Sequence, residues 1–167
     1  MQLAKHPEIQ TKVREELRAH PDTKTEHLPY FRRVLKESMR IVPVGAMGSI
    51  RTTGREIEHQ GLVIPQGAAV FLPQILPMRD PKVFTNPDDF DPDRWESPTT
   101  AMNEAYLPFS LGVRNCPGQS LATSEMYTVL PLILQEYELE LVDEGRLDYF
   151  LTLKYADARI RAKRIHQ

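Results

Sequence analysis

The stretch Phe109-Ser110-Leu111-Gly112-Val113-Arg114-Asn115-Cys116-Pro117-Gly118 holds the only cysteine of this 167-residue chain. Residues 119–137, directly behind it, contain no glycine and predict a helix that begins at Gln119. The amino terminus of a helix presents unpaired N–H groups and the positive end of the helix dipole. Cys116 is therefore predicted to lie where a thiolate is stabilised.

A metal–thiolate bond suits this cysteine better than a role as a free nucleophile. A helix terminus contributes about 0.3–1 kcal/mol toward a nearby negative charge, whereas ionising a free cysteine at neutral pH requires about 2 kcal/mol. A bound metal deprotonates a coordinating sulfur outright. Arg114 can pair with a carboxylate and Phe109 supplies an aromatic wall, which together suggest an iron porphyrin. The simpler alternative is a small buried residue, the commonest fate of a lone cysteine.

Composition and charge exclude several other classes of protein. The chain is 41% hydrophobic and 26% charged, which is typical of a globular domain. Its net charge of −2 offers no general attraction to nucleic acid, and no nucleic-acid partner is predicted. One cysteine rules out an internal disulfide, and the five histidines never fall at metal-ligand spacing. No apolar run approaches the roughly 20 residues of a membrane span, and the opening residues do not form a signal peptide.

Two amphipathic helices are predicted in the first 40 residues. Ile9, Val13 and Leu17 recur every four residues in a helix that begins at Pro7 and ends before Pro21. The second helix extends from about residue 29 to residue 39 and is apolar on two sides, which is typical of a buried helix.

Glu37 and Arg40 lie three residues apart on this second helix. Charges on a buried helix must be mutually paired to be tolerated. On spacing alone, however, a surface ion pair is the simpler interpretation. The pair by itself does not decide between a buried cluster and a solvated face.

The remaining segments predict a mainly α fold with small β-sheets, of the α+β class. Residues 41–50 are kept from forming a helix by Pro43 and two glycines. β structure is expected over residues 57–72, where the runs 62–64 and 68–72 flank a Pro-Gln-Gly turn. The proline-rich residues 73–98 predict a long ordered loop. Pro131 is expected to kink the last helix or to force repair of its hydrogen bonds, and two or three short strands follow.

Several of these features resemble one family. Phe109, Gly112, Arg114, Cys116 and Gly118 stand in the order Phe-x-x-Gly-x-Arg-x-Cys-x-Gly, which resembles the haem-binding signature of the cytochrome P-450 superfamily. Glu37-Ser38-Met39-Arg40 resembles its Glu-x-x-Arg motif on a buried helix. Pro92-Asp93-Arg94-Trp95 resembles the later loop whose arginine completes a glutamate–arginine–arginine cluster. Because the motifs occur together and in the family's order, a buried cluster is favoured over the surface pair.

The resemblance implies a role for each matching residue. Haem b, iron protoporphyrin IX, would be the cofactor, with Cys116 as the proximal thiolate ligand to the iron. Arg114 and Arg51 would bind its propionates, Phe109 would pack beside the thiolate, and Gly112 and Gly118 would let the backbone turn and approach the porphyrin. Glu37, Arg40 and Arg94 would be structural. The expected lining on the substrate side is Val44, Ala46, Met47 and Ser49, with the turn at residues 154–157 as a further contact.

The implied activity is that of a monooxygenase, which inserts one atom of O₂ into a small apolar organic substrate with electrons from a reductase. Residues 1–167 would form the C-terminal portion of such a domain, without the distal haem helix. The complete protein is expected at the endoplasmic reticulum membrane, held by an N-terminal anchor that this chain lacks. Two alternatives remain open: an inactive haem-binding remnant, and an isomerase or dehydratase of peroxides. Met78, where the family often has histidine, and Pro131 depart from its pattern.

Overall fold

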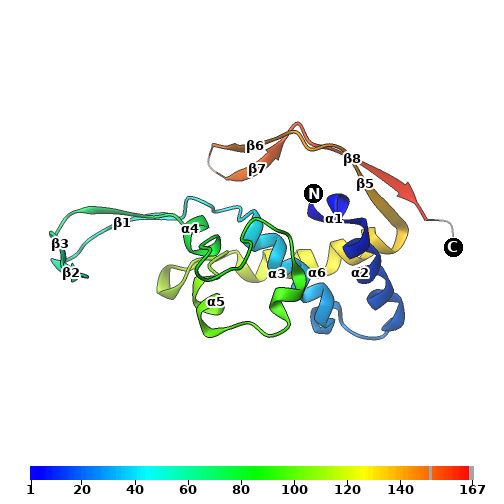
Figure 1. Cartoon of the computed structure of the whole chain (residues 1–167), viewed down its shortest axis with the longest axis horizontal. Helices are drawn as coiled ribbons and strands as arrows, with labels where there is room; N and C mark the ends of the chain where they lie inside the picture. Colours follow the sequence, from blue (N-terminus) through cyan, green and yellow to red (C-terminus); the bar gives the residue numbers. More distant parts are fainter. Residues whose placement is uncertain (151, 166–167) are drawn as a thin grey trace.

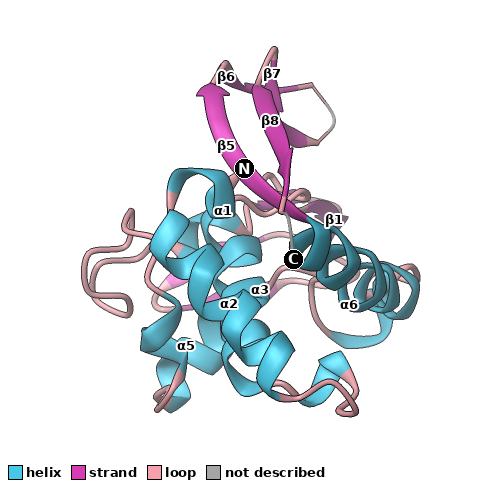
Figure 2. Ribbon diagram, turned by 90° about the vertical axis from the view of Figure 1, so that its right-hand side faces the viewer, coloured by secondary structure: helices cyan, strands magenta, loops and turns pink. Residues whose placement is uncertain are grey.

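The computed structural model describes residues 1–150 and 152–165. Helices α1 (Gln2–Lys5), α2 (Pro7–Ala19), α3 (Pro29–Ile41) and α6 (Gln119–Glu136) form the body of the molecule. Figure 2 shows these helices gathered below the C-terminal strands. Their apolar faces share one core, which includes Val13, Phe31, Val34 and Leu134. The prediction of a helical fold with small sheets is confirmed.

Helix α3 is buried on both sides, as its two-sided apolar pattern predicts. Phe31 and Val34 are fully buried on it, and so are the charged residues Glu37 and Arg40. Its amino terminus is closed by α2, because the Glu16 carboxylate accepts the backbone N–H groups of Tyr30 and Phe31, each at 2.8 Å. A carboxylate at this end also complements the helix dipole. The amino terminus of α3 is thereby joined to the side of α2.

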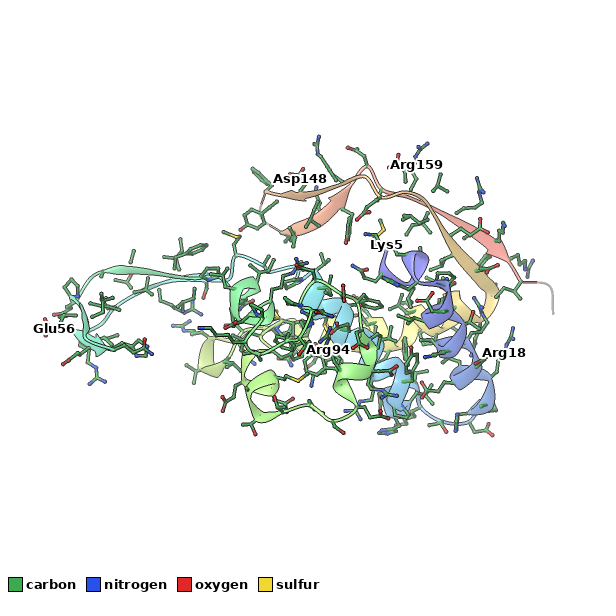
Figure 3. All side chains as sticks on the ribbon, in the orientation of Figure 1. Lys5, Arg18, Glu56, Arg94, Asp148 and Arg159 are labelled. Atoms are coloured by element: carbon green, nitrogen blue, oxygen red, sulfur yellow. The ribbon has the colours of Figure 1, made fainter. Side chains whose placement is uncertain are left out.

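A narrow β ribbon projects from the body (Figure 1), and Glu56 marks its far tip in Figure 3. Strand β1 (Ser49–Thr52) pairs with β4 (Ala69–Leu72), and β2 (Ile57–His59) pairs with β3 (Leu62–Ile64), both antiparallel. The two runs that flank the Pro-Gln-Gly turn therefore do not pair with each other. Thr53 lies between the two strand pairs and stabilises the turn, because its hydroxyl donates to the Pro65 carbonyl at 2.7 Å and accepts the Ala68 N–H at 3.0 Å.

The C-terminal residues form four strands among those described, where two or three were expected. Strand β5 (Tyr137–Asp143) pairs with β8 (Arg159–Arg164), and β6 (Arg146–Tyr149) pairs with β7 (Leu153–Ala156). The strands of the hairpin β6–β7 have only four residues each, so alternation gives little signal for them. It returns to the body through the Leu153 N–H, which donates to the Val44 carbonyl at 2.9 Å.

The proline-rich segment is ordered, as expected, but contains short helical turns that its prolines conceal. These are α4 (Ile75–Met78) and the 3-10 turn η2 (Pro92–Trp95), with α5 (Thr100–Ala105) just beyond. Phe84, Trp95, Met102 and Ala105 bury a second, smaller core beneath them. Two further 3-10 turns are η1 (Thr25–His27) and η3 (Gly112–Arg114). The segment wraps around the carboxyl-terminal half of α3.

Candidate functional site

A cavity of about 690 Å³ opens where three distant segments meet. The end of α3 and the residues after it form one wall, the cysteine loop and the start of α6 form another, and Thr152 contributes from the C-terminal hairpin. Most of the lining is apolar or backbone. Its chemically distinctive members are Cys116, Arg51, Arg114, Phe109, Ser49 and Gln74.

The cysteine loop is closed by its own backbone. The Cys116 N–H donates to the Phe109 carbonyl at 2.9 Å, and the Cys116 carbonyl accepts the Gln119 N–H at 3.3 Å. The cysteine is exposed and lies two residues before Gly118, which caps α6. This is the position at a helix amino terminus that the sequence predicts, and it is not that of a buried hydrophobic residue.

The two glycines of the loop act differently. Gly112 has φ +75°, a left-handed conformation that favours glycine, and its neighbour Ser110 is also left-handed at +64°. Gly118 has an ordinary φ of −85°, so the backbone turn does not require glycine there. A Cβ at Gly118 would lie 3.8 Å from the Cys116 sulfur. Its hydrogen therefore leaves room beside the sulfur, whereas Gly112 shapes the loop and does not itself line the cavity.

Arg51 and Arg114 reach the same cavity from opposite segments. Arg51 is on strand β1 and Arg114 is at the end of η3. Neither guanidinium is paired with a carboxylate from residues 1–150 or 152–165. The cavity thus presents two arginines suited to binding a carboxylate-bearing ligand.

The structure places two of the four residues expected to line the substrate side on this cavity. Val44 and Ser49 line the cavity, but Ala46 and Met47 do not. Ala46 is only 2% exposed, because its carbonyl accepts the Ile75 N–H at 2.9 Å and draws the chain toward α4. From the C-terminal hairpin the lining residue is Thr152, not residues 154–157, because Tyr155 faces Gln2 on α1.

Gln74 joins two walls of the cavity, a role that sequence reasoning missed. Its side-chain nitrogen donates to the carbonyls of Leu107, at 3.1 Å, and Gly45, at 3.2 Å, while its oxygen accepts the Ser110 hydroxyl at 3.3 Å. This amide orientation is the one that satisfies all three partners. A lone glutamine among prolines carries no local pattern, so only the contact between distant segments reveals it.

Beneath the cavity wall, Glu37, Arg40 and Arg94 form one buried cluster. The Glu37 carboxylate accepts one hydrogen bond from Arg40 on each of its two oxygens, each at 2.8 Å, and a further hydrogen bond from Arg94 Nε at 2.9 Å. Glu37 and Arg40 have no exposed side-chain surface and Arg94 has 8%. Figure 3 labels Arg94 at the centre of the helical body. The structure brings together all three residues that the motifs predict.

The cluster also organises the loop that surrounds it. Arg40 donates to the carbonyls of Met78 and Pro87, at 3.0 and 2.7 Å. Arg94 donates to the Thr85 carbonyl at 2.9 Å. Trp95 Nε1 adds a 2.8 Å hydrogen bond to Glu37, a partner that the sequence analysis did not identify although the residue follows Arg94 directly. A proline-rich segment cannot pair all of its carbonyl groups within itself. The side chains of Arg40 and Arg94 satisfy several of these carbonyls.

Lys36 on α3 and Tyr106 after α5, neither of which lines the cavity, have shifted pKa values. The Lys36 ammonium lies 4.0 Å from the centre of the Trp95 ring and 5.0 Å from that of Tyr106. Burial lowers the pKa of Lys36, with repulsion from Arg32 as a smaller cause. Burial also raises the pKa of Tyr106, whose hydroxyl finds no partner among the described residues.

Within residues 1–150 and 152–165, no group of three His, Cys, Asp or Glu side chains is arranged to hold a metal ion. In the same part of the chain, no helix has the length and apolar character needed to cross a membrane. The remaining candidate ligand for a metal is the single sulfur of Cys116, which suits a metal whose other ligands come from a cofactor.

A lone cysteine before a helix, two arginines on an apolar cavity and a buried Glu-Arg-Arg cluster form the arrangement expected of the haem-thiolate class. A family model described as cytochrome P-450 matches residues 1–154. Human cytochrome P-450 2S1 is 39% identical over 149 residues, which cover 83% of this chain and 29% of that protein. Mouse mitochondrial sterol 26-hydroxylase is 34% identical over 154 residues, covering 83% of this chain and 28% of that protein.

The structural comparison agrees with the sequence comparisons. The solved structure of retinoic acid-bound cyanobacterial CYP120A1 matches with a TM-score of 0.86 at 26% identity, covering 98% of this chain and 40% of that one. The chain belongs to the cytochrome P-450 family, whose members bind haem b through a cysteine thiolate. It spans 29% of the human relative's length and 28% of the mouse hydroxylase's.

Proposed function

We propose that this chain forms the haem-thiolate portion of a cytochrome P-450 monooxygenase, with Cys116 as the protein ligand to the iron. The observation that carries the proposal is the convergence of Cys116, Arg51 and Arg114 on one largely apolar cavity. A porphyrin needs these groups: a sulfur for the metal, cations for the propionates and apolar walls for the ring. The residues present therefore fit haem b.

Each residue of the cavity has a distinct task in this proposal. Cys116 lies two residues before Gly118, which caps α6, and would supply the sulfur ligand to the iron. Arg51 and Arg114 would bind the propionates of the haem. Phe109, which lines the same cavity, would provide an apolar wall for the ring. The Glu37 cluster exchanges no protons in this scheme, because its carboxylate is already paired with two guanidinium groups.

When bound, haem ligated by a thiolate supplies the chemistry for activating O₂. The protein binds an apolar organic substrate on the side lined by Val44, Ser49 and Thr152. A reductase supplies the electrons. Two relatives support an apolar substrate by their names, one a sterol hydroxylase and the other bound to retinoic acid. We place the complete enzyme at the endoplasmic reticulum membrane.

The test is the absorption spectrum of the haem-reconstituted chain, reduced and bound to carbon monoxide. The chain should give a strongly red-shifted Soret band, which Cys116→Ala abolishes. Ser124→Ala, an exposed substitution on α6 outside the cavity, should leave the band unchanged. Arg51→Leu or Arg114→Leu should keep the band and weaken haem affinity about tenfold or more, as expected for loss of a charge-assisted hydrogen bond. A band that persists in Cys116→Ala would refute the proposal.

A further inference from the structure

Pro131 lies inside α6, the helix that follows Cys116. A proline has no backbone N–H, so the carbonyl four residues earlier loses its helical partner. In α6 this carbonyl belongs to Tyr127. An interior proline commonly kinks or breaks a helix at this point.

The Tyr127 carbonyl nevertheless has a partner. The hydroxyl of Thr25, the first residue of η1, donates to it at 2.6 Å. The contact is partly buried and joins residues 102 positions apart in the sequence. It lies beside the Phe31 ring, which meets the Tyr127 ring edge-on at 5.8 Å. A side chain from another element therefore replaces the hydrogen bond that Pro131 removes.

The carboxyl end of α6 is held in a similar way. Arg14 Nε donates to the Leu134 carbonyl at 3.0 Å, one of the carbonyls that a helix end leaves unpaired. Only Pro131 and Leu134 are buried on α6, whereas Gln119, Ser120 and Leu121 at its start are exposed. The amino-terminal half of the helix has no fully buried residue, and the most deeply buried residues of α6 lie beyond Tyr127.

This geometry makes Cys116 sensitive to the direction of α6. At 1.5 Å per residue, about 12 Å of helix separate Tyr127 from Gln119. A kink of about 20°, the lower end of sharp kinks, would move Gln119 by about 4 Å. Functional groups must be held to within about 0.5 Å, which corresponds to a bend of only about 2° over this length.

We propose that Thr25 is a positioning residue for Cys116. Its hydroxyl takes the place of the N–H that Pro131 lacks and maintains the direction of α6, so that the sulfur stays aligned with the cavity. The inference rests on the proposed role of Cys116 as the haem ligand. In this proposal the roles of Thr25 and Pro131 are coupled. The Thr25 hydroxyl is needed because Pro131 has no N–H to donate to the Tyr127 carbonyl.

A double-mutant cycle on the full chain tests this pairing. Thr25→Val removes the hydroxyl at nearly constant shape, Thr25→Ser retains it, and Pro131→Ala restores the backbone N–H. Two quantities are measured in each variant: amide hydrogen exchange over residues 119–130 without haem, and haem affinity together with the thiolate carbon monoxide band.

Thr25→Val should accelerate exchange about tenfold and weaken haem affinity by a similar factor, as expected for loss of one partly buried hydrogen bond. Thr25→Ser should stay within about twofold of the parent. In the Pro131→Ala background, Thr25→Val should change either quantity less than about twofold. Equal effects of Thr25→Val in both backgrounds would overturn the proposal.

The two readouts separate this inference from the function on which it rests. If Cys116→Ala abolishes the thiolate band but the cycle shows no coupling, the positioning role fails and the haem-thiolate function stands. If the band survives Cys116→Ala, the function fails and with it the role of Thr25 toward haem. Hydrogen exchange in the haem-free chain then still reports whether Thr25 repairs the helix.

Discussion

Replacing Glu37 by glutamine should destabilise the protein more than loss of almost any other single charge. The Glu37 carboxylate accepts five donors: two from Arg40, one each from Arg94 and Trp95, and the Asp91 N–H. Glutamine has nearly the same shape but is neutral, and one of its two polar atoms becomes an NH₂ group that faces donors. Two guanidinium groups would then lie buried without a counter-charge.

The size of the effect follows from burial. Breaking a buried ion pair by neutralising one partner costs about 3–5 kcal/mol, because the remaining charge stays desolvated. Arg79 and Asp88 provide a matched control, since their N–O distance of 2.8 Å equals that of Arg40 and Glu37 while Asp88 is 78% exposed. Neutralising such an exposed pair costs about 0–1 kcal/mol. The difference between the two variants isolates the contribution of burial.

The assay is chemical denaturation of the parent, Glu37→Gln and Asp88→Asn, followed by tryptophan fluorescence. Trp95 is the only tryptophan and donates to Glu37, so its emission reports directly on the cluster. Glu37→Gln should lower the free energy of unfolding by about 3–5 kcal/mol or abolish the cooperative transition. A loss below about 1 kcal/mol, equal to that of Asp88→Asn, would show that the cluster does not hold the loop around α3.

Two further predictions concern a glycine and a buried phenol. Gly48→Ala should lower the free energy of unfolding by more than about 3 kcal/mol. The φ of +68° is strained for alanine, and an added Cβ would overlap the Leu72 carbonyl oxygen as well. Gly67→Ala, at φ +81° with open space around it, should lower the free energy of unfolding by about 1–2 kcal/mol in the same chemical denaturation assay, and equal losses in the two variants would contradict this. Burial raises the pKa of the Tyr106 hydroxyl. Above about pH 10 the unfolded chain therefore loses this proton while the folded chain keeps it, and the free energy of unfolding falls as the pH rises further. Tyr106→Phe should make that decline shallower and leave stability at pH 7 equal or higher by about 1 kcal/mol, because it removes a hydroxyl without a partner. An alkaline decline as steep as in the parent would contradict the second prediction.

Local chemistry accounts for the features that the sequence predicted well. Helices α2 and α3 follow from apolar spacing and from prolines at their first positions. The two-sided apolar pattern of α3 predicted that the helix is buried, whereas the buried state of Glu37 and Arg40 was predicted only from the joint occurrence of the family's motifs. The cysteine loop could be placed before a helix because Gly118 and Gln119 mark where the helical pattern starts. Apart from the burial of Glu37 and Arg40, each of these conclusions depends on residues within one or two helical turns of one another.

The amino-acid sequence by itself determined the long helices α2, α3 and α6, the cysteine loop and the family to which the chain belongs, because helical periodicity is local and the motifs and their order can be read directly along the chain. Tertiary structure alone decided which strands pair, why Ala46 turns away from the cavity, and how Gln74 and Thr25 satisfy carbonyls on remote segments. A polar side chain can pair with any unpaired backbone group that folding brings within about 3 Å. Sequence spacing cannot predict which group becomes the partner, because the hydrogen bond from Thr25 joins residues 102 positions apart.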